Sequence, residues 1–176
     1  AFLNHTGLGN YSRVLIKSMV FYYPEHQYDL YTPKQTDLYY PIPRQIKVFE
    51  PQSFLYKKFP SLWRSRGIVK DSHRDTAIYH GLSNELPYGI NKHACKKVVT
   101  IHDLIFLHYP EQYKASDVAI YKRKWKYACE TADKIIATSK ATKNDILHFF
   151  PHIDPRKIAV VYQSYHPKFL LRSPLD

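Results

Sequence analysis

The strongest constraint on the fold is a short β-branched run in the second half of the chain. Residues 98–101 are valine, valine, threonine and isoleucine, and His102 and Asp103 follow directly. A short run that is apolar on both sides is typical of a strand buried in a parallel sheet between two layers of helices. Ligands of open α/β sheets bind at the carboxyl ends of the strands, so the His–Asp pair is a candidate site. The alternative is a hydrogen-bonded core histidine beside an aspartate that caps a turn.

Strand and helix patterns alternate along the rest of the chain, which predicts an α/β fold with a Rossmann-like parallel sheet and helices on both faces. Further strands are expected at 28–32, 46–49, 76–80, 134–138 and 157–162. Helices are expected at about 10–22, 116–131 and 140–150, the last with Ser139 as its N-cap. The inward positions predicted for the first helix are Tyr11, Val14, Leu15, Ser18, Met19 and Tyr22. Those predicted for the second are Ile120, Tyr121, Trp125, Ala128 and Ala132.

The charge of the chain restricts its partners. The 176 residues carry a formal net charge of +11, which suits nucleic acid, anionic lipid headgroups or phosphate-bearing small molecules. Cys95 and Cys129 match no metal or disulfide spacing, and a reduced cytosolic setting is the default expectation. The sequence contains no apolar run of about 18 residues or more, so no membrane-spanning helix is predicted.

Two glycines near the beginning of the sequence form a second candidate site. Gly7 and Gly9 come just before a helical pattern that is predicted to begin near Asn10. A glycine loop that leads into a helix directs backbone N–H groups, and the positive end of the helix dipole, toward an anion. The alternative is an ordinary tight turn. Such a loop usually follows a strand, and we therefore expect the first strand of the sheet to be missing from this sequence.

Residues 54–66 interleave aromatic and basic side chains. An interfacial or nucleic-acid-binding surface has this composition. The preferred interpretation is a helix whose aromatic side packs in the core while its cations face water. The alternative is a peripheral contact with an anionic membrane, made by Phe54, Tyr56, Phe59 and Trp63 beside Lys57, Lys58, Arg64 and Arg66.

The order of these motifs resembles the N-terminal domain of a retaining GT-B glycosyltransferase of family 4. The segments that carry the resemblance are residues 6–11, 79–87, 99–104, 132–139 and 157–163. It implies one half of a GT-B enzyme: an acceptor-side Rossmann-like domain at 1–164 and the start of an interdomain linker at 165–176. The donor-binding domain, which carries a Glu-x7-Glu pattern in such enzymes, is expected to be absent here, and the fragment alone is expected to be inactive.

The resemblance also implies roles for individual residues. His102 would contact the donor sugar near the reacting centre, and Asp103 would orient either the imidazole or the acceptor. Gly7, Gly9 and Asn10 would let the donor diphosphate approach the first helix. Transfer with retention would need no protein nucleophile. The expected acceptor-binding residues are Tyr11, His80, Ser83, Asn84 and Ser139.

The expected partners are a nucleotide-sugar donor, a glycan or lipid-linked acceptor and the second domain, with no metal or other cofactor and no nucleic acid. The expected location is the cytoplasm, with room for a contact at the inner face of the membrane. Two other classes remain open. One is a non-catalytic basic module that binds nucleic acid or a nucleotide. The other is a metal-dependent hydrolase built on the His–Asp pair, although the other histidines lack metal-ligand spacing.

Overall fold

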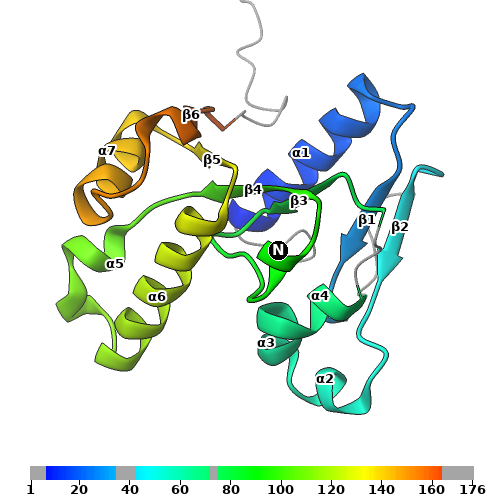
Figure 1. Cartoon of the computed structure of the whole chain (residues 1–176), viewed down its shortest axis with the longest axis horizontal. Coiled ribbons are helices and arrows are strands. Elements are labelled where there is room, and N and C mark those ends of the chain that lie inside the picture. The colour runs from blue at the N-terminus through cyan, green and yellow to red at the C-terminus, as the bar shows by residue number, and fades with distance from the viewer. Residues whose placement is uncertain (1–6, 35–42, 72–74, 164–176) are drawn as a thin grey trace, which may run out of the picture.

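The computed structural model describes residues 7–34, 43–71 and 75–163 and has an α/β fold with parallel strands (Figure 1). One sheet has four strands in the order β3-β4-β5-β6, and a second has the two strands β1 and β2. All the strand pairs described are parallel. The strands are β1 (Tyr28–Tyr31), β2 (Ile46–Phe49), β3 (Ile78–Gly81), β4 (Lys96–Ile101), β5 (Lys134–Ala137) and β6 (Ile158–Val160). Every strand expected from the sequence is present, with ends displaced by no more than two residues.

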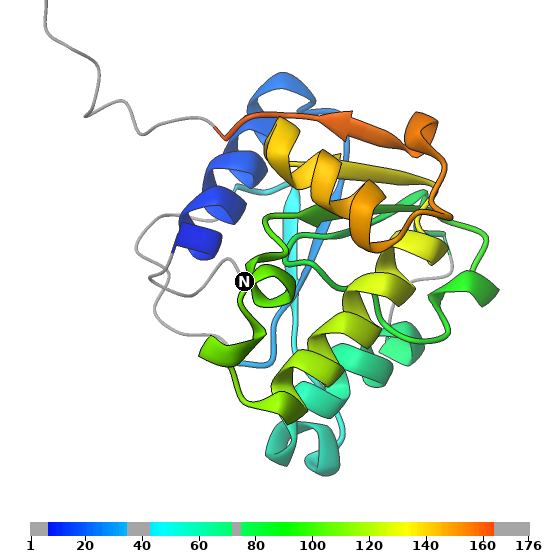
Figure 2. The ribbon, with the colours of Figure 1, turned by 90° about the vertical axis from the view of Figure 1, so that its left-hand side faces the viewer.

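The helices cover the sheets and join the strands. They are α1 (Gly7–Tyr22), α2 (Phe54–Lys58), α3 (Pro60–Leu62), α4 (Ile68–Asp71), α5 (Ile105–His108), α6 (Ala115–Thr131) and α7 (Lys140–Phe149). A π-helical turn at Trp63–Gly67 links α3 to α4, and 3-10 turns lie at Ile90–Lys92, Pro110–Gln112 and Pro155–Lys157. Figure 2 shows α1 on one side of the strands and α6 and α7 on the other.

Alternation along β4 explains the two layers. Val99 and Ile101 are fully buried in the main core with residues of α6 and α7, including Ala128 and Ile146. Thr100 points to the opposite face, where its hydroxyl meets Tyr11 of α1. Because successive side chains of a strand alternate between faces, one β-branched run serves both helix layers. Of the inward positions expected for α6, Ala128 and the C-cap residue Ala132 are buried, whereas Ile120 is 42% exposed.

The predicted inward face of α1 is wrong. Its buried residues are Gly9, Ser12 and Ile16, whereas Met19 is 38% exposed and Tyr22 is 71% exposed. The buried set follows the spacing of one helix face, and the Ser12 hydroxyl donates to Leu8 O at 2.8 Å, which satisfies a polar group on that face. Ile16 packs with Ile46 of β2, so α1 covers the β1–β2 pair.

The interpretation of residues 54–66 as one helix with its aromatic side in the core is also wrong. Pro60 follows the end of α2 and starts α3, because proline lacks the N–H that would continue a helix. Trp63 is fully buried, but Phe54 is 82% exposed and Phe59 is 49% exposed. Of the aromatic residues in this segment, only Trp63 is therefore fully buried, and Tyr56 is half-buried.

The division of the strands into two sheets bears on the expected missing strand. In the order observed, β1 and β3 are both edge strands within the described part of the chain. A strand between them would join the two sheets into one, which is the arrangement expected if a first strand is missing from this sequence. The missing strand stays a prediction. The expected linker at 165–176 lies outside the described residues.

Candidate functional site

The carboxyl edge of the four-stranded sheet brings together several predicted site residues. His80 lies opposite Val98 in the β3–β4 pair, and β4 ends at Ile101, which lies opposite Ala137 of β5. His102 is the first residue beyond β4. The parallel register therefore places the ends of β3, β4 and β5 at one edge, as expected for a ligand site of an α/β sheet.

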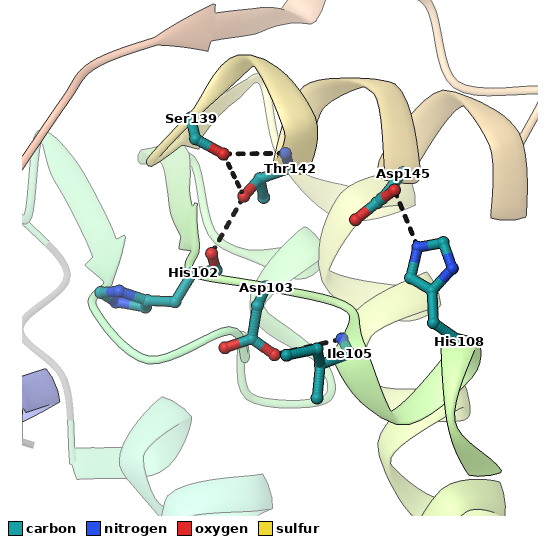
Figure 3. A network of polar contacts seen from close by, with 7 residues as sticks. All are labelled: His102, Asp103, Ile105, His108, Ser139, Thr142 and Asp145. Atoms are coloured by element: carbon teal, nitrogen blue, oxygen red, sulfur yellow. Dashed lines mark hydrogen bonds and ion pairs between the residues drawn. The ribbon is translucent and has the colours of Figure 1, made fainter.

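The backbone of His102 is held by three side chains. Its N–H donates to Asn84 Oδ1 at 2.7 Å, and its carbonyl accepts from Thr138 Oγ1 at 2.8 Å and Thr142 Oγ1 at 3.0 Å. Ser139 supports this clamp (Figure 3), because its Oγ accepts from Thr142 N at 3.0 Å as the N-cap of α7 and lies 2.9 Å from Thr142 Oγ1. Since the Thr142 hydroxyl proton goes to His102 O, the Ser139 hydroxyl must donate to Thr142.

The imidazole of His102 is fixed as one neutral tautomer. Nε2 lies 3.0 Å from Leu82 O, which can only accept, so Nε2 carries the proton. Nδ1 then accepts from the side-chain amide of Gln163 at 2.9 Å. Burial lowers the pKa of His102, and this effect outweighs the raising effects of the Leu82 hydrogen bond and of Asp103. The ring is therefore neutral at pH 7, with Nδ1 as its acceptor.

Asp103 caps a turn rather than orienting the imidazole. Its Oδ1 accepts from Ile105 N at 3.3 Å at the start of α5, and Figure 3 shows the carboxylate on the Ile105 side, away from the His102 ring. Its carbonyl accepts from the indole N–H of Trp125 at 3.2 Å. The geometry favours the capping alternative, and a contact between Asp103 and the acceptor stays a prediction.

Thr100 joins three elements through one hydroxyl. His80 Nε2 lies 2.9 Å from Thr100 Oγ1, and the Tyr11 hydroxyl lies 3.3 Å from the same atom. The Tyr11 ring also meets the His102 ring edge-on, with centroids 4.9 Å apart. Tyr11 of α1, His80 of β3 and His102, which directly follows β4, therefore meet at the end of β4.

We expect the free energy of unfolding to fall as the pH drops from about 6.5 to about 4, because of His80. Burial lowers the pKa of His80 from 6.5 to about 4, so between these values the unfolded chain binds a proton that the folded protein does not. This contribution is fully present above pH 6.5, is lost progressively toward pH 4, and amounts to about 3 kcal/mol. Urea titrations across this window measure it.

The matched control is His80→Gln, which keeps a polar group toward Thr100 but has no proton to gain. The difference in unfolding free energy between wild type and variant should change with pH across the window. A difference that stays constant would show that His80 titrates normally in the folded protein.

Two residues of the loop after β3 have different environments. Asn84 is buried, has φ of 61°, and uses its backbone N–H to reach Thr100 O at 3.0 Å, while its side chain holds His102 as described above. A left-handed conformation is tolerated by asparagine better than by most residues, which explains its place here. Ser83 Oγ is buried and has no hydrogen-bond partner among the described residues. Ser83 directly follows Leu82, whose carbonyl binds His102.

The glycine motif lies inside a helix, which corrects the predicted loop. The helix α1 begins at Gly7, so Gly9 and Asn10 belong to its first turn instead of preceding it. A Cβ at Gly7 would meet nothing within 4 Å among the described residues. The N–H groups of a first helical turn have no partner within the helix, so the anion-binding interpretation does not depend on the loop.

The described residues contain no group of three or more His, Cys, Asp or Glu side chains that could hold a metal ion. They also include no helix that is long and apolar enough to cross a membrane.

The sequence analysis did not predict the contacts of Thr100 with His80 and Tyr11, although a single polar residue in an apolar strand is a usable signal. It also missed Gln163, Thr138 and Thr142 as partners of His102, and no local pattern points to them.

In a comparison with known protein families, residues 7–168 match the model of Glycosyltransferase Family 4. The match covers most of the 176 residues and includes every site residue discussed above. The chain belongs to glycosyltransferase family 4. Its parallel sheet flanked by helices is consistent with the Rossmann-like half of a GT-B enzyme. No curated protein sequence matches the chain.

Membership in the family shows a glycosyltransferase domain, which acts on a sugar donor and an acceptor. It does not assign individual residues, so the roles of His102, the α1 glycines and the acceptor-side residues depend on the geometry described above.

Proposed function

We propose that this domain forms the acceptor side of a glycosyltransferase that moves a hexosyl group from a nucleotide-sugar donor to a glycan or lipid-linked acceptor with retention. The observation that carries the proposal is the fixed, neutral imidazole of His102 at the carboxyl edge of the sheet. A preorganised polar group of this kind stabilises charge or orients hydroxyls without reorganising during the reaction.

The ring atom of His102 that would bind the sugar is Nδ1. Leu82 O belongs to the backbone and stays in place, whereas Gln163 is an exposed side chain that can rotate away. A sugar hydroxyl could then donate to Nδ1 in place of the Gln163 amide. The imidazole would position the sugar and would not attack it, in keeping with transfer that needs no protein nucleophile.

The first turn of α1 would face the donor diphosphate. Gly7, Gly9 and Asn10 contribute backbone N–H groups at a helix end, where the helix dipole favours negative charge. Tyr11, the next residue of α1, contacts the His102 ring, so the proposed phosphate and sugar positions are adjacent. This adjacency is what a nucleotide sugar requires.

On the acceptor side, we propose direct contacts from the half-buried Tyr11 and from Ser83, whose hydroxyl is buried and would have to turn toward the acceptor. His80, Asn84 and Ser139 already bind other groups of the protein through their side chains. For these three we propose support of the site from behind rather than contact with the acceptor.

By resemblance to two-domain enzymes of this kind, we propose that a second domain supplies the main donor pocket and that this domain alone is inactive. We also propose a cytoplasmic reaction, without a metal or other cofactor, in the synthesis of polysaccharides or related glycans. A form of the protein that includes the donor domain is therefore needed for the functional test.

The test is nucleotide release from a panel of UDP-, GDP-, ADP- and dTDP-sugars, followed by NMR of the anomeric configuration of the product. Release with one donor class, retained configuration and loss of activity in His102→Ala are the expected results. Salt-sensitive binding to RNA or DNA without any nucleotide release would instead favour a non-catalytic basic module.

A further inference from the structure

Residues 54–62, which we call the α2–α3 tip, expose apolar side chains at unusual density. Single exposed apolar residues are common on protein surfaces, but a cluster within nine consecutive positions is not. An open hollow of about 530 Å³ lies among them, lined by Leu55, Lys58, Phe59, Pro60, Ser61 and Leu62. The exposed fractions are 82% for Phe54, 53% for Leu55, 49% for Phe59 and 39% for Leu62.

The α2–α3 tip is held in place by a buried anchor. Trp63 follows it directly, is fully buried, and donates its indole N–H to Asp71 Oδ2 at 2.6 Å. Gly67 allows this packing, since a Cβ there would overlap Trp63 Cδ1. Figures 1 and 2 both show α2 and α3 at one end of the molecule, with β6 at the other. The apolar side chains are therefore presented by an ordered projection.

The charged residues of the α2–α3 tip itself and of the segment around it in the sequence are all basic. Residues 51–70 include Lys57, Lys58, Arg64, Arg66 and Lys70 and no aspartate or glutamate. The Lys58 ammonium lies 5.9 Å from the centroid of the Phe59 ring, so cation and apolar ring occupy the same patch. Arg64 reaches Glu85 at 3.8 Å, yet its side chain remains 47% exposed.

We propose that the α2–α3 tip inserts into the surface of an anionic lipid bilayer. Phenylalanine and leucine side chains enter the headgroup–acyl boundary, and neighbouring lysines and arginines bind anionic headgroups. A nucleic-acid surface would use aromatic rings for stacking, whereas Leu55 and Leu62 offer no ring to a base. A bilayer satisfies both the aliphatic and the cationic groups of the α2–α3 tip. The proposal does not depend on the catalytic roles assigned above.

The test is co-sedimentation with sucrose-loaded vesicles of phosphatidylcholine, with and without phosphatidylglycerol. The protein should bind only the anionic vesicles, and added salt should weaken the binding. Phe54→Ser with Phe59→Ser, and separately Lys57→Gln with Lys58→Gln, should each lower the partition coefficient roughly tenfold. The matched control is Phe21→Ser, which removes a 76% exposed ring from the far end of α1 and should leave binding unchanged.

Circular dichroism and tryptophan emission, to which the buried Trp63 contributes together with Trp125, establish that each variant is folded. Equal binding to neutral and anionic vesicles, no loss in the two double variants, or an equal loss in Phe21→Ser would each overturn the proposal. Retention of an RNA or DNA oligonucleotide by the α2–α3 tip, with no binding to vesicles, would also overturn it.

Discussion

Replacing His102 by alanine should lower the turnover number of the sugar-transferring protein by roughly 10²-fold or more, with a smaller change in donor affinity. The imidazole is neutral, oriented by Leu82 O and Gln163, and lies against Tyr11 at the proposed sugar position. A group fixed in this way contributes most where charge develops in the transition state. The measurement is steady-state nucleotide release, with kcat and KM determined separately.

A matched variant separates catalysis from folding. His102→Gln retains an N–H donor toward Leu82 O but has no ring nitrogen to accept from a sugar hydroxyl. It should therefore remain close to wild type in thermal unfolding while losing most of its turnover. If both variants unfold at much lower temperature yet keep their activity per folded molecule, His102 is a structural residue and the catalytic assignment fails.

Replacing Trp63 by alanine should lower the free energy of unfolding by about 3–5 kcal/mol. The side chain is fully buried, and its ring lies 6.5 Å from that of Tyr31 in β1. Its removal would leave a cavity between the α2–α3 tip and the β1–β2 sheet and would leave Asp71 without its indole donor. Urea titration monitored by circular dichroism gives the value.

Trp63→Phe is the control, because it fills most of the cavity and loses only the indole N–H. Its expected cost is about 1–3 kcal/mol, the range for a buried partner left unsatisfied. A cost below about 1 kcal/mol for Trp63→Ala would contradict the anchoring role, since full burial of a ring this size is worth more.

The strands could be predicted because local composition decides them. The β-branched run that ends β4 predicts a buried strand from its own composition alone. His102 is a candidate site residue because it follows that run. The helix faces were harder. The sequence of α1 has more than one apolar stripe that could face inward. Which stripe does so is decided by packing against Ile46 of β2, which is thirty residues from Ile16 in the sequence. Tertiary contacts of this kind leave no trace in a local window.

The polar contacts of the site were the least predictable. Thr100 binds Tyr11, which is 89 residues away, and His102 binds Gln163, which is 61 residues away. Sequence spacing identifies which side chains can form hydrogen bonds but not which of them meet. The loop assigned to Gly7 and Gly9 failed for a different reason: glycine suggested a turn, but both residues lie within the first turn of α1.

The Gln163 amide has a consequence for the energetics of substrate binding. Gln163 lies two residues after Val161, whose N–H makes a sheet-like bond to Ala137 O at 3.0 Å, so the glutamine can turn away without breaking the sheet. If a sugar hydroxyl donates to His102 Nδ1 as proposed above, the Gln163 amide is the group that it would replace. A hydroxyl that takes its place exchanges one hydrogen bond for another, so this contact adds little to ground-state affinity. The contact can orient the sugar, but the affinity for the sugar must come from other contacts.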